Sequence, residues 1–289
     1  SLEACWAAKL KGQEQADLLT IASPFLEHLK SLIYDEAGDL PGQWTVTQRY
    51  AATALAGFQL TYSTEHYASA EMLLAAASQN ADDATWLAIA SSLRIVSLAA
   101  QGKSNAARQH IDALSNSTPD QWLQVLNQLQ TVATGAPDDT RKTIAQMQIH
   151  LFTALTDRLT GVTADFKRKW SLIEAQAYIQ SGNLTEGFTK YQQLAAKNPR
   201  HGLIQLRYAQ ALSQSKDHFE AGLIQWRRVL QGNPPKSDRW YEAKFRIAEL
   251  YLKNGKREAA EKQVRYLEVT SGFGTWESEF TELLKRIAP

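Results

Sequence analysis

The stretch from Lys244 to Leu267, KFRIAELYLKNGKREAAEKQVRYL, predicts two amphipathic helices joined by a turn. Apolar residues recur three and four positions apart on both sides of Gly255, which is the spacing that lines one face of a helix. Gly255 itself is a typical helix stop. Ala248 and Ala260 are small residues at which two helices can cross closely, and Tyr251 can fill the space beside them. The stretch therefore predicts an antiparallel helix pair.

The same order of small and large residues recurs upstream. One copy consists of Ala175, Tyr178, Gly182, Gly187, Tyr191, Leu194 and Pro199. Another, with one inserted residue, consists of Ala209, Leu212, Gly222, Trp226, Val229 and Pro234. A more distant copy consists of Leu98, Gly102, Ala107, Ile111, Leu114 and Pro119, with Ile95 in place of the small residue. Repetition at a nearly fixed period indicates a stack of helix pairs.

This spacing resembles the tetratricopeptide repeat (TPR). The resemblance implies an all-α fold, a right-handed α-solenoid of stacked antiparallel helix pairs that ends in a C-terminal capping helix. It also implies that the first helices of the pairs line a concave groove that binds peptides or protein surfaces. An irregular helical bundle with chance similarities is the alternative fold.

Composition agrees with a helical, well-packed chain. Of 289 residues, 44% are hydrophobic and 21% charged, with only 15 Gly and 8 Pro, so a sizeable core can form. We expect residues 1–44 to form an N-terminal helical cap and residues 45–160 to form divergent helical repeats. Residues 161–289 should form three TPR-like units, of which the last includes the capping helix. The apolar stripe of that helix consists of Trp276, Phe280, Leu283, Leu284 and Ile287.

The residue patterns of catalysis and metal binding are largely missing. The single cysteine, Cys5, excludes an intramolecular disulfide, and the six histidines are not paired at zinc-site spacing. The sequence contains no Gly-rich phosphate loop and no nucleophile elbow. Ser213 to Lys216 reads S-x-x-K, but it falls where a first repeat helix ends, so we interpret it as a turn. We therefore expect no enzyme, no metal and no cofactor in this chain.

Several polar pairs fit helix starts better than chemistry. Asp82–Asp83 and Asp138–Asp139 precede apolar runs, where carboxylates cap free backbone amides. Asn116 and Asn183 match the glycosylation tripeptide, but Pro119 and the repeat turn explain their composition without any sugar. The most apolar window, residues 84–100, is shorter than the roughly 20 residues of a bilayer span and contains an arginine, so it predicts a buried helix.

Charge differs between the two halves of the chain. Residues 1–161 contain 10 Lys and Arg and 16 Asp and Glu, a net charge of −6, whereas residues 162–289 contain 21 and 14, a net charge of +7. The C-terminal half could attract an acidic partner, or copies could associate head to tail. The alternative is that these charges are solvated and have no role. Nucleic-acid binding is disfavoured because basic residues alternate with Glu along the helices.

The leading functional hypothesis is a non-catalytic scaffold that binds a protein or peptide in the concave groove. The candidate groove residues are Lys169, Gln176, Arg207, Gln210, Arg246 and Glu249. Some TPR proteins clamp a C-terminal carboxylate with Lys and Asn on the first helices. The matching positions here are Leu172, Gln176, Leu203 and Glu242, so capture of such a tail is not expected, although Arg207 and Arg246 remain.

Two alternatives stay open. One is an envelope or cell-surface assembly factor built on the same repeats, which would need a leader or a lipid anchor. The chain begins Ser1-Leu2-Glu3 without an initiator Met, so we expect a processed form or an excised fragment, and the compartment is not readable. The other is a helical region of a larger enzyme. The partner and the oligomeric state are not encoded in any recognisable pattern.

Overall fold

The computed structural model describes residues 15–62, 66–114 and 117–288. Within these ranges the chain forms 14 α-helices and no β-strand, which confirms the predicted all-α class of paired helices. The described chain divides into two compact units. The first contains residues up to 167 together with residues 180–182, and the second contains residues 168–179 and 183–288. The repeat boundaries expected at residues 44 and 160 stay predictions.

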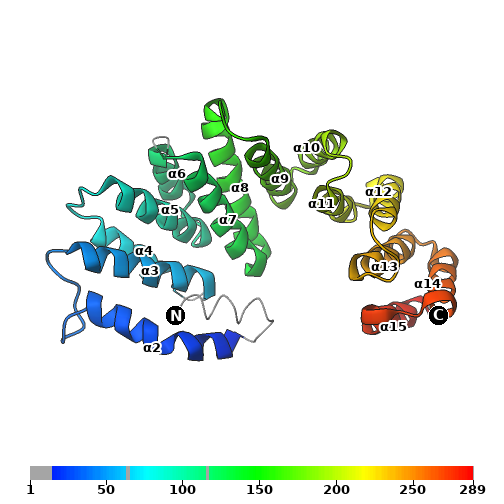
Figure 1. Ribbon diagram of the computed structural model, residues 1–289, viewed down its shortest axis with the longest axis horizontal. Helices are drawn as coiled ribbons and strands as arrows, with labels where there is room; N and C mark the ends of the chain where they lie inside the picture. The colour runs from blue at the N-terminus through cyan, green and yellow to red at the C-terminus, as the bar shows by residue number, and fades with distance from the viewer. Residues whose placement is uncertain (1–14, 63–65, 115–116, 289) are drawn as a thin grey trace. The chain divides into compact units, whose positions relative to one another are not determined.

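The first unit is built by helices α2 to α8. Their bounds are α2 Gln15–Ile33, α3 Val46–Tyr62, α4 Tyr67–Ala77, α5 Ala84–Ala100, α6 Ser104–Ala113, α7 Pro119–Gly135 and α8 Asp138–Leu155. Consecutive helices pack as the pairs α3/α4, α5/α6 and α7/α8, and α5 lies between α3 and α7 (Figure 1). Cys5 and the rest of residues 1–14 lie outside the described residues.

The second unit contains most of α9 and the helices that follow it. The bounds are α9 Ala164–Gln180, α10 Leu184–Lys197, α11 Gly202–Leu212, α12 Phe219–Gln231, α13 Asp238–Lys253, α14 Arg257–Ser271 and α15 Glu277–Ile287. Helices α13 and α14 are the pair that the opening stretch predicts, and their turn contains Gly255 at a φ of 72°. That left-handed conformation favours glycine.

Helix starts are fixed by the polar residues that the sequence places there. The Asp83 carboxylate accepts from the backbone N–H groups of Thr85 and Trp86, at 2.9 and 3.1 Å, and begins α5. Asn183 accepts from the Glu186 N–H at 3.4 Å and begins α10. The contacts of Asp83 confirm its interpretation as a helix cap, and the structure adds Asn183 as a second cap. Asn116 lies outside the described residues.

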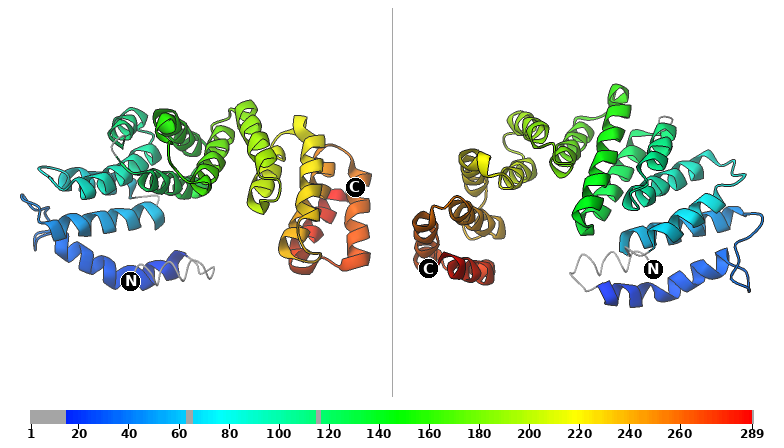
Figure 2. Two further views of the ribbon diagram at one scale, coloured as in Figure 1. Left: turned by 45° about the horizontal axis from the view of Figure 1, so that its top comes forward. Right: turned by 180° about the vertical axis from the view of Figure 1, so that it is seen from behind.

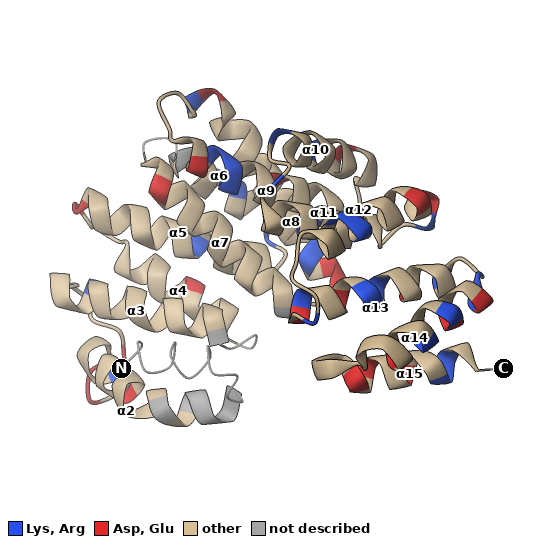
Figure 3. Cartoon of the chain, turned by 45° about the vertical axis from the view of Figure 1, so that its right-hand side comes forward, with Lys and Arg blue, Asp and Glu red and all other residues tan. Residues whose placement is uncertain are grey.

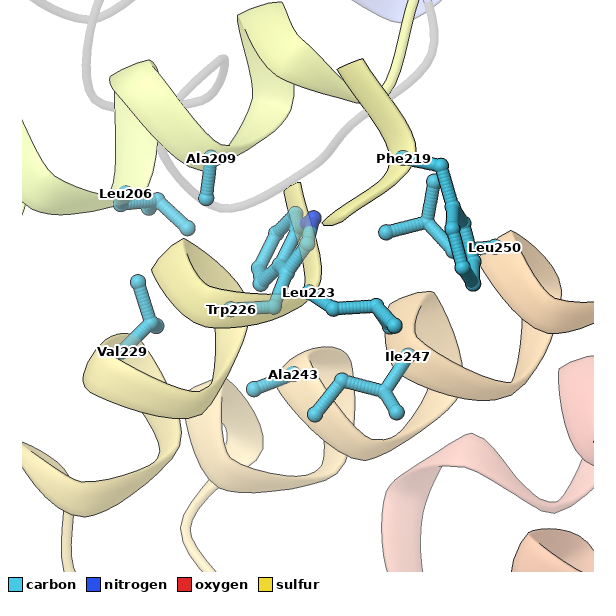
Figure 4. Packing of buried hydrophobic residues seen from close by; sticks show 9 residues of the cluster. All are labelled: Leu206, Ala209, Phe219, Leu223, Trp226, Val229, Ala243, Ile247 and Leu250. Carbon is cyan, nitrogen blue, oxygen red and sulfur yellow. The ribbon is translucent and has the colours of Figure 1, made fainter. Parts of the chain in front are cut away.

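One core cluster of the second unit forms around Trp226 of α12, which is fully buried with residues of α11 and α13 (Figure 4). Its neighbours in this cluster are Leu206, Ala209, Phe219, Leu223, Val229, Ala243, Ile247 and Leu250. The Trp226 indole N–H donates to the Ser213 hydroxyl at 2.7 Å. Ser213 in turn donates to the Ala209 carbonyl at 2.9 Å. The serine of the S-x-x-K match therefore anchors a core tryptophan.

Helix α15 closes the apolar face of the preceding pair. Phe280, Leu283 and Ile287 are buried in one cluster with Val264 and Leu267 of α14. Figure 2 shows α14 and α15, orange and red, packed against each other. The predicted capping helix is therefore present. Its buried residues, Phe280, Leu283 and Ile287, are three of the five residues of the predicted stripe.

The apolar window of residues 84–100 coincides with α5, in which Trp86, Ile95 and Val96 are fully buried. A buried helix was the expected outcome for this window. None of the helices in the described part of the chain is long and apolar enough to cross a membrane.

Candidate functional site

The first unit contains a groove with a volume of about 900 Å³ that runs across α3, α5 and α7. We call it the α3–α5–α7 groove. Its lining consists of Tyr50, Thr53, Ala54, Gly57, Phe58, Leu60 and Thr61 of α3, Ile89, Leu93 and Val96 of α5, and Asp120, Leu123, Gln124, Asn127, Gln128, Thr131 and Val132 of α7. The groove is thus formed by the first helices of three neighbouring pairs.

The sequence gives α3 two different faces. Ala52, Leu55 and Ala56 are buried in the unit. Gly57 and Thr61, four positions apart and therefore on one side of the helix, line the groove. Helix α5 contributes Leu93 and other aliphatic residues between the two outer helices. The groove therefore has an apolar middle, and most of its polar side chains come from α3 and α7.

Charge is nearly absent from the three helices of the groove. Helices α3, α5 and α7 each have 17 residues with a single charged residue, namely Arg49, Arg94 and Asp120. In Figure 3 these helices are mostly tan, whereas blue and red alternate along α13. Asp120 is the one charged side chain among the described residues that line the groove.

Both arginines of these helices are engaged with α4 and the turn that follows it. Arg49 donates to the carbonyls of Ala77 and Gln79, which lie at the end of α4. Arg94 forms an ion pair with Glu71 of α4 at 2.7 Å. Neither arginine is therefore positioned to neutralise an acidic ligand in the groove.

The threonine hydroxyl groups that line the groove already donate their protons to backbone carbonyls. Thr53 donates to the Tyr50 carbonyl at 2.8 Å, and Thr61 donates to the Gly57 carbonyl at 2.8 Å. Thr131 donates to the Asn127 carbonyl at 3.0 Å in the same way. A hydroxyl has one proton but two lone pairs, so each of these groups can still accept a hydrogen bond.

Two further side chains extend this pattern. The Tyr50 hydroxyl points its proton at the Asp83 carboxylate, 3.4 Å away. The Gln128 Oε1 atom is buried and accepts no hydrogen bond from any residue that the structure describes. The groove is therefore rich in hydrogen-bond acceptors.

The residues singled out by sequence lie in the second unit, on α9, α11 and α13. The structure brings two sets of them together. Arg207 donates to the Gln210 side chain at 3.1 Å, and Gln210 donates across to Glu242 of α13 at 3.1 Å. Arg246 pairs with Glu249 at 2.9 Å. The proposed role of these residues in binding stays a prediction, as it does for Lys169 and Gln176 of α9.

Glu249 is largely buried and is the centre of a cationic cluster. Its carboxylate contacts Arg246, Lys253 at 3.4 Å and Arg286 of α15 at 3.9 Å. Burial on its own raises the pKa of this carboxyl, but the hydrogen bonds and charges of Arg246 and Lys253 outweigh burial and hold the pKa below its usual value. Three cations around one carboxylate leave an excess of positive charge at this place.

The histidines take structural positions. His201 and His218 are the N-cap residues of α11 and α12. Burial, together with the charge of Arg94, lowers the pKa of His110 on α6. Among the described residues, no three His, Cys, Asp or Glu side chains gather closely enough to hold a metal ion.

Comparisons with known proteins show a likeness at the level of structure. No family model matches the chain, and no curated protein matches it. A solved structure of PilF from Pseudomonas aeruginosa is similar, with a TM-score of 0.40 and 13% sequence identity, and the match covers 81% of this chain and 96% of that chain.

Sequence reasoning missed the α3–α5–α7 groove because the repeat signature is strongest in the second unit. One signal was present in the sequence. Three long helices in the N-terminal half carry a single charged residue each, although exposed helix faces normally carry several. Which apolar residues of such helices stay uncovered depends on how the helices pack, and that is visible only in the structure.

Proposed function

We propose that this chain is a non-catalytic scaffold that binds a protein or peptide partner in the α3–α5–α7 groove. The observation that carries the proposal is the groove itself, a largely uncharged cavity of about 900 Å³ lined by three neighbouring helices. Binding sites of this volume are commonly apolar clefts with a few placed polar groups, and the lining of this groove has that composition.

The lining also favours binding over catalysis. Its described residues include no His, Cys or Lys, and Asp120 is the one carboxylate among them. The threonine hydroxyls bond to the carbonyls of their own helix instead of to a base. Such groups can position a ligand but have no partner that would make them reactive.

The experiment that tests this proposal places a large side chain in the groove by a substitution on α3. A methyl group placed on the Gly57 Cα would meet only Leu93 Cδ2 of the described residues within 4 Å, at 3.9 Å, so the Cβ of a larger side chain fits there. Gly57 lines the groove, and Gly57→Trp is therefore expected to fill part of it. Peptides are selected on the wild-type protein from a random library displayed on phage, and their affinities are measured by fluorescence anisotropy. We expect Gly57→Trp to weaken the selected peptides at least about tenfold.

The matched control is Gly202→Trp at the start of α11, where a side chain also meets nothing within 4 Å among the described residues. Both variants should show wild-type helicity by circular dichroism. Binding that survives Gly57→Trp and is lost with Gly202→Trp would move the site to the second unit and overturn the proposal.

A second candidate surface is the polar row of the second unit, centred on Arg207, Gln210 and Arg246. It is favoured by the contact between Gln210 and Glu242, which links α11 to α13. The excess of cations around Glu249 is a further argument for an acidic partner at this surface.

A further inference from the structure

Gly57 lies in the middle of α3, and no close contact within the described chain requires a glycine at this position. Glycine in a helix interior destabilises the helix relative to alanine. Gly187 has an internal reason, because a side chain there would lie 2.6 Å from Ile179. Gly222 has a weaker one, with Leu250 at 3.4 Å. Gly57 has an ordinary 3.9 Å neighbour and faces the groove, so its bare backbone is exposed to an occupant.

The hydrogen-bonding character of the groove limits what that occupant can be. Thr53, Thr61 and Thr131 have donated their protons to their own helices, and Gln128 Oε1 lacks a donor within the described chain. A complementary ligand therefore brings hydrogen-bond donors for these acceptors, and its own acceptors can bond to the side-chain amides of Gln124 and Asn127.

An extended peptide supplies such donors and a helix does not. The backbone N–H groups of a helix are already bonded within it beyond the first turn. An extended chain offers free N–H groups on a given side about every 6.6 Å. On α7, Asp120, Gln124, Asn127 and Thr131 all line the groove at three- and four-residue spacing, which is about 4.5 to 6 Å along the helix axis. The spacing of the N–H groups in an extended peptide is close to the spacing of these side chains, so a short segment can lie along α7.

Charge sets the second restriction. A carboxylate is purely an acceptor, and the described lining of the groove offers it neutral donors such as the Gln124 and Asn127 amides but no cation, whereas Asp120 repels it. Arg49 and Arg94, the cations of the three helices, are held at α4 and its following turn. The net charge of −6 on residues 1–161 adds a long-range repulsion of acidic chains.

We propose that the α3–α5–α7 groove takes an extended peptide segment without acidic residues, whose backbone passes against α3 at Gly57. This inference rests on the proposed function and specifies its ligand. Basic residues are allowed near Asp120, and small or aliphatic side chains fit the apolar middle around Leu93.

The test selects peptides from a random phage library on the wild-type protein, with Gly57→Trp as the counter-selection, so that groove binders remain. The retained sequences should be depleted of Asp and Glu relative to the input library. Gly57→Ala should weaken them at least about fivefold, because the added methyl occupies the space of the bound backbone. Gly202→Ala is the matched control and should bind as wild type.

A second pair of variants tests the acceptor argument. Thr61→Val keeps the shape of the side chain and removes the lone pairs, so binding should fall about fivefold. Thr61→Ser keeps the hydroxyl and should restore wild-type affinity. Thermal unfolding of each variant reports whether the fold is retained, and Gly57→Ala should unfold at the wild-type temperature or above it.

The possible outcomes separate this inference from the proposed function. The extended-chain inference would be overturned if the selected peptides kept Asp and Glu at the frequency of the library. It would also be overturned if Gly57→Ala bound the peptides as wild type while Gly57→Trp still prevented binding. In both cases the groove would remain a binding site. A selection in which no peptide survives the counter-selection would overturn both.

Discussion

Single residues decide how closely the helices of the second unit approach. Gly187 of α10 faces Ile179 of α9, whose side-chain atoms would lie 2.6 and 2.8 Å from an added Cβ and whose backbone N would lie 3.0 Å away. We expect Gly187→Ala to lower the free energy of unfolding by roughly 1 to 3 kcal/mol, because the two helices must separate. Urea denaturation measures the change. Gly57→Ala, where the space is open, is the control, and a Gly187→Ala protein as stable as that control would contradict the close approach.

Ser213 is the second residue with a specific structural role. Removing its hydroxyl leaves the indole N–H of the buried Trp226 without its acceptor. We therefore expect Ser213→Ala to cost roughly 1 to 3 kcal/mol of stability in thermal or urea unfolding. Ser31→Ala, which removes an exposed hydroxyl that donates to the His28 carbonyl, should change stability much less. Equal effects of the two substitutions would argue against the anchoring role.

At the scale of helices, Glu249 connects α13 to α15 through Arg286. Because the pKa of Glu249 is lowered in the folded protein, its contribution to stability is present above its usual pKa of 4.5 and is lost as the pH falls through the folded-state pKa. Glu249→Gln should therefore be less stable than wild type at neutral pH, and the difference should shrink at acidic pH. Denaturation curves at both pH values measure this. A difference that stays constant with pH would contradict the ionic role.

Helix α15 should be a stability element of the second unit. Deleting the chain from Trp276 onward uncovers Val264 and Leu267, and burial of side chains of that size contributes about 1.5 to 3 kcal/mol each. We expect a clearly lower melting temperature by circular dichroism. Phe280→Ala, which is fully buried, should reproduce part of the loss, whereas Thr281→Ala on the exposed side of α15 should not. An unchanged melting temperature after the deletion would rule out capping.

How much the sequence predicts also depends on the scale of the interaction. The helix starts at Asp83 and Asn183, the stripe of α15 and the buried window of α5 follow from neighbours in sequence, and all are present. The α3–α5–α7 groove depends on which faces of three helices, tens of residues apart, remain uncovered after packing. Periodicity identifies an apolar face but cannot tell a face that is covered from one that is left open.

At the scale of the whole molecule, ionic strength should distinguish the two candidate surfaces. A ligand of the nearly uncharged groove should change its affinity less than about threefold between low and high salt. An acidic partner bound to the basic second unit should weaken steeply, because exposed charge pairs are screened beyond about 8 Å at physiological ionic strength. For that partner, Arg207→Ala with Gln210→Ala should weaken binding at least about tenfold. Arg227→Ala with Arg228→Ala on α12 is the control pair, and loss of binding in the control alone would place the partner elsewhere.

The scarcity of charge on α3, α5 and α7 also has an evolutionary consequence. Exposed positions such as Gln124, Asn127 and Thr131 tolerate lysine or glutamate without harm to folding, so random drift should place charges there in related chains. If these positions stay uncharged in distant homologues, natural selection has acted on ligand binding in the groove and not on the stability of the helices. Lineages that have lost the ligand should be the ones in which charges accumulate on this face first.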